Sequence, residues 1–490
     1  MTEMNSKVRV RFAPSPTGFL HVGGLRTALY NYLFAKHHNG EFVLRIEDTD
    51  QSRQVQGAVE NLVGSLHWAG FEYDEGPVPD GSQRGDAGPY FQSERLDLYE
   101  KYTTQLLNDD HAYYCFCSEQ RLEKVRQQQI ERGMQTKYDQ HCRKLTKEER
   151  DSRLEAGVPH VVRMKIPSDD VTDLTVTDAI HGEVSIPFEN LDDQVIMKSD
   201  GFPTYHLANV VDDHSMGISH VIRGEEWLPS TPKHILLYKY LGWDLPVFAH
   251  LPLLLNEDRS KLSKRQGDVA VEDYRKKGYL PEALINFIAL LGWNPGDEQE
   301  IFTLDEMIHK FSLDRINTSG AVFNVEKLQW MNGVYIRNTE IDRLVELSLP
   351  FLEEAGFDTS NREKMQKITE AVQTNLRYLE EIPEVTRVFQ PTSLSRDDIA
   401  EEAKEMLDKE STQKVFNSLA EKLAALDEMP QGKFRELMKE VQKETGVKGK
   451  DLWMPVRIAL TGEMHGPELP AVIEILGRDH CLKRIRDQIQ

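Results

Sequence analysis

The chain has 490 residues, of which 39% are hydrophobic and 29% charged, and its formal net charge is −22. This composition is typical of a globular protein, and the length is enough for about three domains of roughly 100–200 residues each. Two classes of protein are excluded, because no apolar run approaches the ~18 residues that span a bilayer and four cysteines are too few for a disulfide framework.

The N-terminal residues 1–6 contain no basic region followed by an apolar core, so we expect no secretory signal and a cytoplasmic protein. The net charge of −22 argues against a nucleic-acid partner, because phosphate contacts need Lys and Arg. The charges are unevenly spread, however: from Lys433 to the end, eleven Lys and Arg stand against nine Asp and Glu. Composition alone favours an enzyme of small molecules, but local basic patches could still hold an RNA.

The first predicted elements form a βαβ unit. Apolar and polar residues alternate over residues 8–12, which predicts a strand, and apolar residues recur at helical spacing from Leu25 to Leu33. Gly40 is the expected end of that helix. A second apolar run, residues 42–46, predicts another strand, which ends in the acidic turn 47–50. We therefore expect the two strands to lie parallel in an α/β sheet.

The turn before the first helix is the first candidate site, since it contains two prolines, three glycines and His21. Such a turn brings backbone amides and a helix N-terminus, the positive end of the helix dipole, to the carboxyl edge of a parallel sheet. Gly23 and Gly24 let a ligand approach the backbone, and His21 can donate a hydrogen bond to a phosphoryl oxygen. The motif alone is equally compatible with an ordinary Gly/Pro turn that carries a surface histidine.

The middle of the sheet is interrupted. A Gly/Pro/Asp-rich run over residues 74–89 predicts a long loop, and the apolar spacing from Leu96 to Leu106 predicts a helix. Strand signals resume only at residues 194–198. An insertion of this size between two halves of a doubly wound sheet is expected to be a domain of its own.

The insertion contains Cys115, Cys117 and Cys142, with Tyr138 between them. Thiolates at such spacing indicate a tetrahedral zinc site, which needs four ligands. Either Tyr138 or His141 would complete the set. The alternative is that the cysteines are buried thiols without a metal.

A basic loop, Lys-Leu-Ser-Lys-Arg over residues 261–265, follows the apolar run 247–255. Three cations in five residues, beside Ser263, suit the charge that develops on a polyphosphate leaving group. Lys261 and Lys264 are therefore candidates to contact phosphates, although a lone loop of this kind is more often only a solvated surface.

The rest of the chain is predicted to be helical. Pro281 opens a helix, and beyond residue 335 apolar residues keep a spacing of three and four that is typical of core packing. One such row is formed by Met365, Ile368, Val372, Leu376 and Leu379. Basic residues able to hold phosphates follow near the end, namely Lys433, Arg435, Lys448, Lys450 and Arg457.

Taken together, the early His-x-Gly-Gly and the late Lys-x-Ser-Lys-Arg resemble the signature of class I aminoacyl-tRNA synthetases. The resemblance is closer to the bacterial type of glutamyl-tRNA synthetase. It runs from residue 7 to beyond residue 330 in motif form and continues as length and helical pattern alone. The longer motifs that carry it are Arg11–Gly18, Arg45–Asp50, Tyr205–His214 and Ile222–Trp227.

The resemblance implies an α/β Rossmann-type catalytic domain with an inserted α+β domain, followed by an all-α stem-contact region and a helical anticodon-binding domain. The expected boundaries are residues 1–93 and 193–260 for the two catalytic halves, 94–192 for the inserted domain that contacts the tRNA acceptor end, 261–335 for the basic loop and stem-contact region, and 336–490 for the anticodon-binding domain with its two subdomains.

The resemblance also implies a reaction, in which glutamate is activated by ATP with Mg²⁺ and then attached to tRNA(Glu). The catalytic residues would be His21, Lys261 and Lys264. Contacts to ATP would come from His21, Gly23, Gly24, Glu226, Trp227, Lys261, Ser263 and Lys264. Contacts to glutamate would come from Arg11, Ala13, Ser15, Glu47, Tyr205, Asn209 and Arg223. In relatives a Cys-x-Cys and a later Cys-x-His bind structural zinc, whereas here Lys144 stands in place of that histidine.

The residue types fit these roles. Arg11 and Arg223 each offer a planar fork for a carboxylate, and Glu47 offers a negative partner for an ammonium group. A lone arginine is more often part of a surface ion pair, but two arginines inside matching motifs favour a site.

Several alternatives remain open at this stage. They are an enzyme that also charges tRNA(Gln), an enzyme that glutamylates a modified tRNA base, a glutaminyl enzyme, a nucleotidylyltransferase of the same fold that uses no RNA, and a non-catalytic RNA-binding paralogue. The helical tail argues against the second, third and fourth, and the presence of His21, Lys264 and Arg223 argues against the last. By resemblance, the protein is expected to be a monomer.

Overall fold

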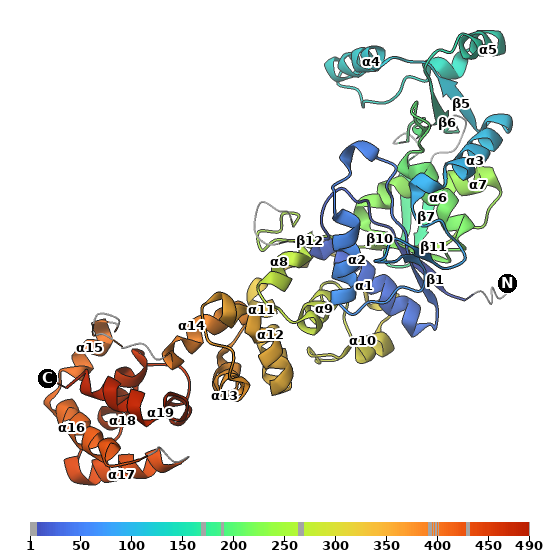
Figure 1. Cartoon of the computed structure of the whole chain (residues 1–490). Coiled ribbons are helices and arrows are strands. Elements are labelled where there is room, and N and C mark those ends of the chain that lie inside the picture. Colours follow the sequence, from blue (N-terminus) through green and yellow to red (C-terminus); the bar gives the residue numbers. More distant parts are fainter. Residues whose placement is uncertain are drawn as a thin grey trace. The chain divides into compact units, whose positions relative to one another are not determined.

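The computed structural model describes residues 7–167, 173–187, 191–262, 269–390, 394, 396, 399, 401–427 and 432–489 (Figure 1). It divides into two compact units, Met1–Asp273 with Ile285–Asn324 and Tyr274–Leu284 with Val325–Gln490. The candidate site lies in the first unit. None of the described helices is long and apolar enough to cross a membrane.

The predicted βαβ unit is present at the start of the first unit. β1 (Arg9–Phe12) and β2 (Glu41–Leu44) pair in parallel, with Arg9 opposite Glu41, and α1 (Val22–His37) connects them. α1 is buried on most sides because it contacts β1, β2 and β10 (His220–Gly224) as well as α10 (Leu304–Lys310). A helix enclosed in this way needs no polar face over its buried length.

A four-stranded sheet continues from β10 in the order β10-β11-β7-β8. β11 (Val247–Leu251) pairs in parallel with both β10 and β7 (Asp173–Asp178), and β8 (Gly182–Pro187) is the antiparallel partner of β7. β1 lies beside β10, where the Ser219 N–H donates to the Arg9 carbonyl at 2.9 Å. The apolar core of this region includes residues of the strands and of α3 (Leu96–Asn108), α6 (Tyr205–Ser215) and α7 (Thr231–Leu241), which pack against one another.

The pairing of two strands differs from the expectation. β9 (Val195–Met197) begins where the catalytic sheet was expected to resume, but it pairs with β6 (Val161–Met164) in the antiparallel sheet β5-β6-β9. β7 lies inside the expected insertion but belongs to the sheet of β10 and β11. Apolar runs predict that a strand forms, whereas its partner depends on contacts between residues far apart in the chain.

The insertion otherwise consists of β5 (Ala112–Cys115), α4 (Glu119–Glu131) and α5 (Lys147–Glu155) around β6 and β9. Smaller elements of the first unit and of its border with the second are α2 (Ala58–Trp68), β3 (Gly76–Pro77), β4 (Gln83–Arg84), β12 (Leu254–Leu255), α8 (Val271–Lys276), α9 (Pro281–Ala289) and β13 (Ala321–Val322).

The described elements of the second unit beyond residue 325 are helical, as predicted. They are α11 (Val325–Asn338), α12 (Ile341–Glu354), α13 (Arg362–Val372), α14 (Ile382–Thr386), α15 (Glu401–Leu407), α16 (Glu410–Ala424), α17 (Lys433–Thr445), α18 (Lys450–Thr461) and α19 (Leu469–Arg486). They share one apolar core. The predicted apolar row is buried throughout, but α13 ends at Val372, so Leu376 and Leu379 reach the core from the turns that follow.

Candidate active site

A cavity of about 1020 Å³ in the first unit gathers the predicted site residues. It lies at the carboxyl ends of β1, β2 and β10, which is where α/β sheets place their ligands. Ser263 and Lys264 lie outside the described residues. The other predicted ligand-binding residues all line the cavity, namely Arg11, Ala13, Ser15, His21, Gly23, Gly24, Glu47, Tyr205, Asn209, Arg223, Glu226, Trp227 and Lys261.

His21 is the N-cap of α1, and its Nδ1 accepts a hydrogen bond from the Gly24 N–H at 3.1 Å. A neutral imidazole that accepts at Nδ1 carries its proton on Nε2, which is the tautomer able to donate to a phosphoryl oxygen. The two glycines make room for this arrangement. A Cβ at Gly23 would lie 3.1 Å from the His21 ring, and a Cβ at Gly24 would lie 2.9 Å from Leu20 Cδ1.

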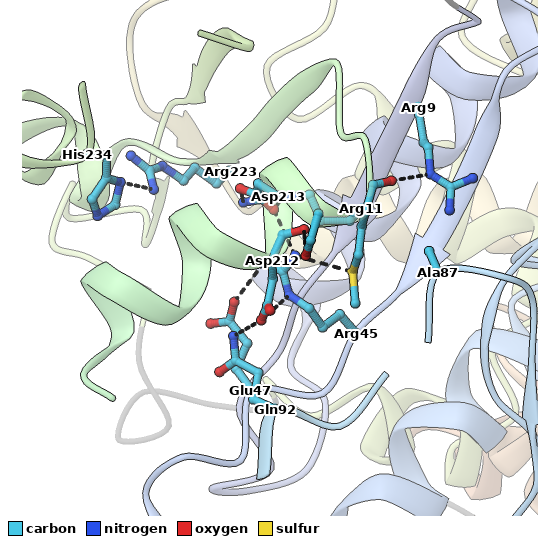
Figure 2. Close-up of polar contacts among 12 residues, drawn as sticks. Arg9, Arg11, Arg45, Glu47, Ala87, Gln92, Asp212, Asp213, Arg223 and His234 are labelled. Carbon is cyan, nitrogen blue, oxygen red and sulfur yellow. Dashed lines mark hydrogen bonds and ion pairs between the residues drawn. The ribbon is translucent and has the colours of Figure 1, made fainter. Parts of the chain in front are cut away.

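Arg11 lies at the end of β1 and is engaged by an acid of the protein itself. Its Nε and Nη2 donate to the two carboxylate oxygens of Asp213 at 2.9 and 3.2 Å. Arg45 Nη1 donates to the same carboxylate at 2.8 Å (Figure 2). Burial works against ionisation of Asp213, but the charges of Arg11 and Arg45 outweigh it and hold the pKa of Asp213 below its usual range.

The neighbours of Asn209 fix the orientation of its side-chain amide: the nitrogen is assigned toward Asp213 Oδ2, at 3.3 Å, and the oxygen toward Arg11 Nη2, at 3.2 Å. Asp212, the neighbour of Asp213 on α6, accepts from Arg95 Nε at 2.7 Å. Three arginines, Arg11, Arg45 and Arg95, thus stand with three buried acids, Asp212, Asp213 and Glu47. Their charges cancel within the protein.

Glu47 follows β2 and is 7% exposed. Its Oε1 accepts from Arg45 Nη2 at 3.1 Å. Burial raises the pKa of Glu47, while the charges of Arg45 and Arg11 act in the opposite direction. A carboxylate has two acceptor oxygens. Glu47 can therefore accept from Arg45 at Oε1 and from an ammonium group at Oε2.

Arg223, at the end of β10, differs from Arg11, Arg45 and Arg95 because its partners are neutral. Its guanidinium donates to His250 Nε2 at 3.0 Å, to Tyr205 Oη at 3.0 Å, to His234 Nδ1 at 3.1 Å and to Thr231 Oγ1 at 3.0 Å. Among the residues that the structure describes, no carboxylate forms an ion pair with Arg223, which is 4% exposed. A buried cation without an internal counter-charge is suited to an anionic ligand.

The rest of the cavity wall includes two aromatic rings, an acid and a lysine. The rings of Tyr205 and Trp227 lie 4.1 Å apart, centroid to centroid. The Glu226 side chain folds over Gly224, where an added Cβ would lie 2.2 Å from Glu226 Oε2. Lys261 is exposed at the edge of the cavity.

The three cysteines of the insertion lie together with Tyr138. Their sulfur atoms are all within 4.8 Å of one another, and the Tyr138 hydroxyl is 3.3 Å from Cys115 Sγ and 3.5 Å from Cys117 Sγ. Four donors at these separations fit a tetrahedral zinc ion with Zn–S of about 2.3 Å and Zn–O of about 2.0 Å. His141 is exposed and is not part of this group.

Several residues around Arg223 were not predicted, namely Asp178, Thr231, His234 and His250. The signal was present in one case, since His250 is a polar residue inside the apolar run 247–255 and is fully buried. A buried histidine in an apolar strand needs partners on both ring nitrogens. The partners come from β7 and β10, and their proximity depends on the sheet order.

Comparison with known proteins agrees with this geometry. Residues 7–330 match the catalytic-domain family of class I tRNA synthetases for E and Q, and residues 343–489 match an anticodon binding domain family. Glutamate–tRNA ligases from Clostridioides difficile and Alkaliphilus metalliredigens are 49% and 48% identical to the chain, each over 98% of both sequences.

Solved structures give the same result. A glutamate–tRNA ligase from Elizabethkingia meningosepticum, in complex with its amino acid, has a TM-score of 0.90 at 38% identity and covers 99% of both chains. The corresponding enzyme of Elizabethkingia anophelis has a TM-score of 0.89 at 38% identity, over 99% of this chain and 100% of that one. With a mixed α/β catalytic region, a helical C-terminal region and full-length identity to these proteins, the chain belongs to the glutamate–tRNA ligases of the class I tRNA synthetases.

Proposed function

We propose that the cavity activates L-glutamate with ATP to form glutamyl-adenylate and pyrophosphate, and then transfers the glutamyl group to the 3′ end of tRNA(Glu) for protein synthesis. The observation that carries this proposal is Arg223, a buried cation with neutral partners only, in the same cavity as the acid Glu47 and the glycine turn. Glutamate is an amino acid with an additional carboxylate, so it needs both an acid and an unpaired cation.

The amino acid is held at the carboxyl ends of β1, β2 and β10. Glu47 takes the ammonium group, and Arg223 takes a carboxylate with Tyr205 as a second, neutral donor. Arg11 already forms a bidentate pair with Asp213, so its role is to fix Asp213 and Asn209 beside the amino acid. Ala13 and Ser15 also line the cavity.

ATP is held on the other side of the cavity, by the turn before α1. His21 and the N-terminus of α1 contact the phosphates, with Gly23 and Gly24 as their close neighbours. Glu226 and Trp227 contact the nucleoside. Lys261 and the neighbouring Ser263 and Lys264 stabilise the pyrophosphate as it leaves, and Mg²⁺ enters with ATP as part of the substrate.

Selectivity against glutamine follows from the charge of Arg223. The neutral amide of glutamine would leave the guanidinium buried without a counter-charge, and such mismatches discriminate by about 10⁴–10⁵. The test is charging of purified tRNA(Glu) and tRNA(Gln), each with labelled glutamate and with labelled glutamine, together with pyrophosphate exchange with and without tRNA.

Charging of tRNA(Glu) with glutamate alone would support a discriminating enzyme. Glutamate on both tRNAs would support the same chemistry with a wider tRNA range. No charging, under conditions in which a control synthetase is active, would contradict the proposal.

The other parts of the chain would hold the tRNA. The inserted domain would contact the acceptor end, and the helical unit would contact the anticodon, with phosphates held by Lys433, Arg435, Lys448, Lys450 and Arg457. The protein would act as a monomer, which sedimentation with and without tRNA would test.

We further propose that Cys115, Cys117, Cys142 and Tyr138 hold one structural zinc ion. The ion would tie β5 to the segment that carries Tyr138 and Cys142, and it would keep the thiolates ionised. Protein purified without added metal is expected to contain one zinc per chain, and removal by a chelator should lower the melting temperature of the insertion. Cys142→Ser is expected to lose the metal, whereas Cys481→Ser, which changes a buried thiol far from the cluster in sequence, should retain it. Zinc well below one equivalent in the unaltered protein would contradict the site.

A further inference from the structure

A buried relay of side chains connects Arg223 to Asp178, which lies in β7 on the far side of β11. His250 stands between them: its Nε2 accepts from Arg223 Nε at 3.0 Å and its Nδ1 lies 2.6 Å from Asp178 Oδ2. His250 is fully buried, and Asp178 is 2% exposed. These residues come from β7, β10 and β11, so the order of the sheet creates the relay.

The hydrogen bonds fix the tautomer of His250. A carboxylate can only accept, so the proton of His250 must be on Nδ1, where it is donated to Asp178. Nε2 is then an acceptor, which is what the Nε–H of Arg223 requires. Burial lowers the pKa of His250, and the charge of Arg223 acts in the same direction while Asp178 opposes it. His250 is therefore neutral at pH 7.

His234 plays the matching part on the other side of Arg223. Its Nδ1 accepts from Arg223 Nη1 at 3.1 Å, and its Nε2 lies 3.1 Å from Nδ1 of His206. With Nδ1 as the acceptor, Nε2 of His234 carries the proton and donates to His206. Two histidines with opposite tautomers thus present lone pairs to one guanidinium.

The arrangement holds Arg223 without neutralising it. A carboxylate in direct contact would fix the guanidinium equally well, but it would compete with the substrate for the same charge. Asp178 is instead separated from Arg223 by the imidazole ring of His250. The four partners of Arg223 occupy four of the five N–H groups of the guanidinium, which leaves one N–H of Nη2 for a ligand.

We propose that Asp178, His250 and His234 are positioning residues, which orient Arg223 as an uncompensated cation for the side-chain carboxylate of glutamate and so determine the preference for glutamate over glutamine. This inference rests on the proposed function of the cavity. The residues act through Arg223 and do not themselves contact the substrate.

The structure makes a sharp prediction for Asp178→Asn. Asp178 Oδ1 accepts from the backbone N–H groups of Ile180 at 3.0 Å, His181 at 3.0 Å and His250 at 3.3 Å. These donors will keep the amide oxygen of the asparagine in the Oδ1 position. The NH₂ group must then occupy the Oδ2 position and face His250 Nδ1, which forces the proton of His250 onto Nε2, against Arg223 Nε–H. An acid-to-amide change beside a catalytic histidine inverts the tautomer in the same way in serine proteases.

We expect Asp178→Asn to raise the KM for glutamate by about 10- to 100-fold, the range for one lost hydrogen bond to a charged group, and to lower discrimination against glutamine. The KM for ATP should stay unchanged. Asp193→Asn is the matched control, because Asp193 is an equally buried acid of the same unit that pairs with Arg143 and not with the relay. It is expected to lower stability without changing the KM for glutamate.

His250→Gln tests the direction of the hydrogen bonds in the relay. The glutamine NH₂ can donate to Asp178 while its oxygen accepts from Arg223, as the present tautomer of His250 does, so His250→Gln alone should raise the KM for glutamate by less than about threefold. In that background Asp178→Asn must turn the glutamine amide round and bring its NH₂ toward Arg223, so the rise in KM should return. An unchanged KM in a folded Asp178→Asn protein would overturn the proposal, and so would the absence of any effect of Asp178→Asn in the His250→Gln background.

The ¹⁵N spectrum of the histidine side chains reports the tautomer of His250 directly. The measurement needs no enzymatic activity and no variant of Asp178. Protein with ¹⁵N-labelled histidine should show one neutral ring with its proton on Nδ1 that is absent from His250→Gln. A proton on Nε2 of His250 would overturn the proposal. If the unaltered protein failed to charge tRNA with glutamate, the proposed function would fail, and the spectrum would still decide the tautomer.

Discussion

Arg11 and Arg223 are both buried arginines on the cavity wall, but their surroundings give them different chemistry. Arg11 faces Asp213 in a bidentate pair, and the neighbouring arginines and acids balance one another. Arg223 faces two histidines, a tyrosine and a threonine. In a low-dielectric wall the unbalanced charge determines the net potential. The sequence motifs present both arginines alike, and only the structure shows that Arg11 is paired with an acid whereas Arg223 has neutral partners.

The first prediction concerns Arg223. Arg223→Ala is expected to raise the KM for glutamate by at least about 100-fold, because a charge-assisted hydrogen bond and its electrostatic attraction are lost together. Discrimination against glutamine, about 10⁴–10⁵ in the unaltered site, should nearly disappear. Aminoacylation kinetics with both amino acids measure this directly.

Arg223→Lys is the matched variant, since it keeps the charge but loses the planar fork. It should keep a preference for glutamate with a weaker KM, because one ammonium group cannot reach the four acceptors that hold the guanidinium. If Arg223→Ala kept its full preference for glutamate, the assignment of the selectivity to Arg223 would be wrong.

At the scale of the element, the glycines at the N-terminus of α1 leave room for a side chain of the protein, the His21 ring, as well as for a ligand. Gly23 and Gly24 are helical, and neither has a positive φ. Their importance is steric, because the His21 ring folds back over the first turn to accept from the Gly24 N–H. The same contact places the proton of a neutral His21 ring on Nε2.

Gly23→Ala is therefore expected to reduce activity without reducing stability. Its Cβ would lie 3.1 Å from Nδ1 and Cε1 of His21, so the ring must move by a few tenths of an ångström and its hydrogen bond to Gly24 must lengthen. We expect a fall in kcat of about 10-fold or more, as is typical when a transition-state donor is misplaced. Single-turnover adenylate formation is the measurement.

Gly64→Ala in α2 is the control for Gly23→Ala. A Cβ there has no atom within 4 Å, and alanine favours a helix over glycine by about 1 kcal/mol. The control should melt at a higher temperature with unchanged kcat. Equal kcat in both alanine variants would contradict the steric role of Gly23.

The elements themselves could largely be predicted from sequence, and their assembly could not. The alternation before Phe12 and the helical spacing after Val22 are local signals, and β1 and α1 follow them closely. The partner of a strand is not a local property. For this reason β9 lies outside the catalytic sheet to which it was assigned, and β7 joins that sheet from within the expected insertion. The environment of Arg223 was missed with them, because Asp178 reaches His250 only through the pairing of β7 with β11.

At the scale of the whole molecule, the net charge of −22 does not describe the site. The buried acids Asp212, Asp213 and Glu47 are paired with arginines inside the protein, whereas Arg223 forms no ion pair with a described carboxylate. An acidic net charge and a local site for anions can therefore coexist, since a buried charge is screened far less by salt than a charge on the surface. Binding of a polyanionic nucleotide depends on this local balance.

The catalytic unit also depends on histidines that are neutral when folded. Burial lowers the pKa of His206 to about 4, with Lys233 and Arg223 acting in the same direction, and burial lowers the pKa of His234 as well. His206 and His234 join α6 to α7 beside Arg223. In the unfolded chain both would titrate near 6.5. Between about pH 6.5 and 4, the unfolded state therefore binds more protons than the folded state, and stability must fall as the pH falls.

We expect the melting temperature of the catalytic unit to decrease from pH 7 to pH 5, with His206 alone contributing about 2 kcal/mol of lost stability over the 1.5 units below 6.5. The buried carboxylates do not explain this loss. The pKa values of Asp178 and Asp213 are lowered, so their protonation destabilises the fold only at more acidic pH, and burial raises the pKa of Glu47, which acts in the opposite direction as the pH falls. His206→Gln keeps a hydrogen-bonding side chain beside His234 but cannot titrate, so its melting temperature should depend less on pH. Calorimetry of both proteins at pH 7, 6 and 5 measures the difference, and identical slopes would show that His206 is not among the groups that take up the proton.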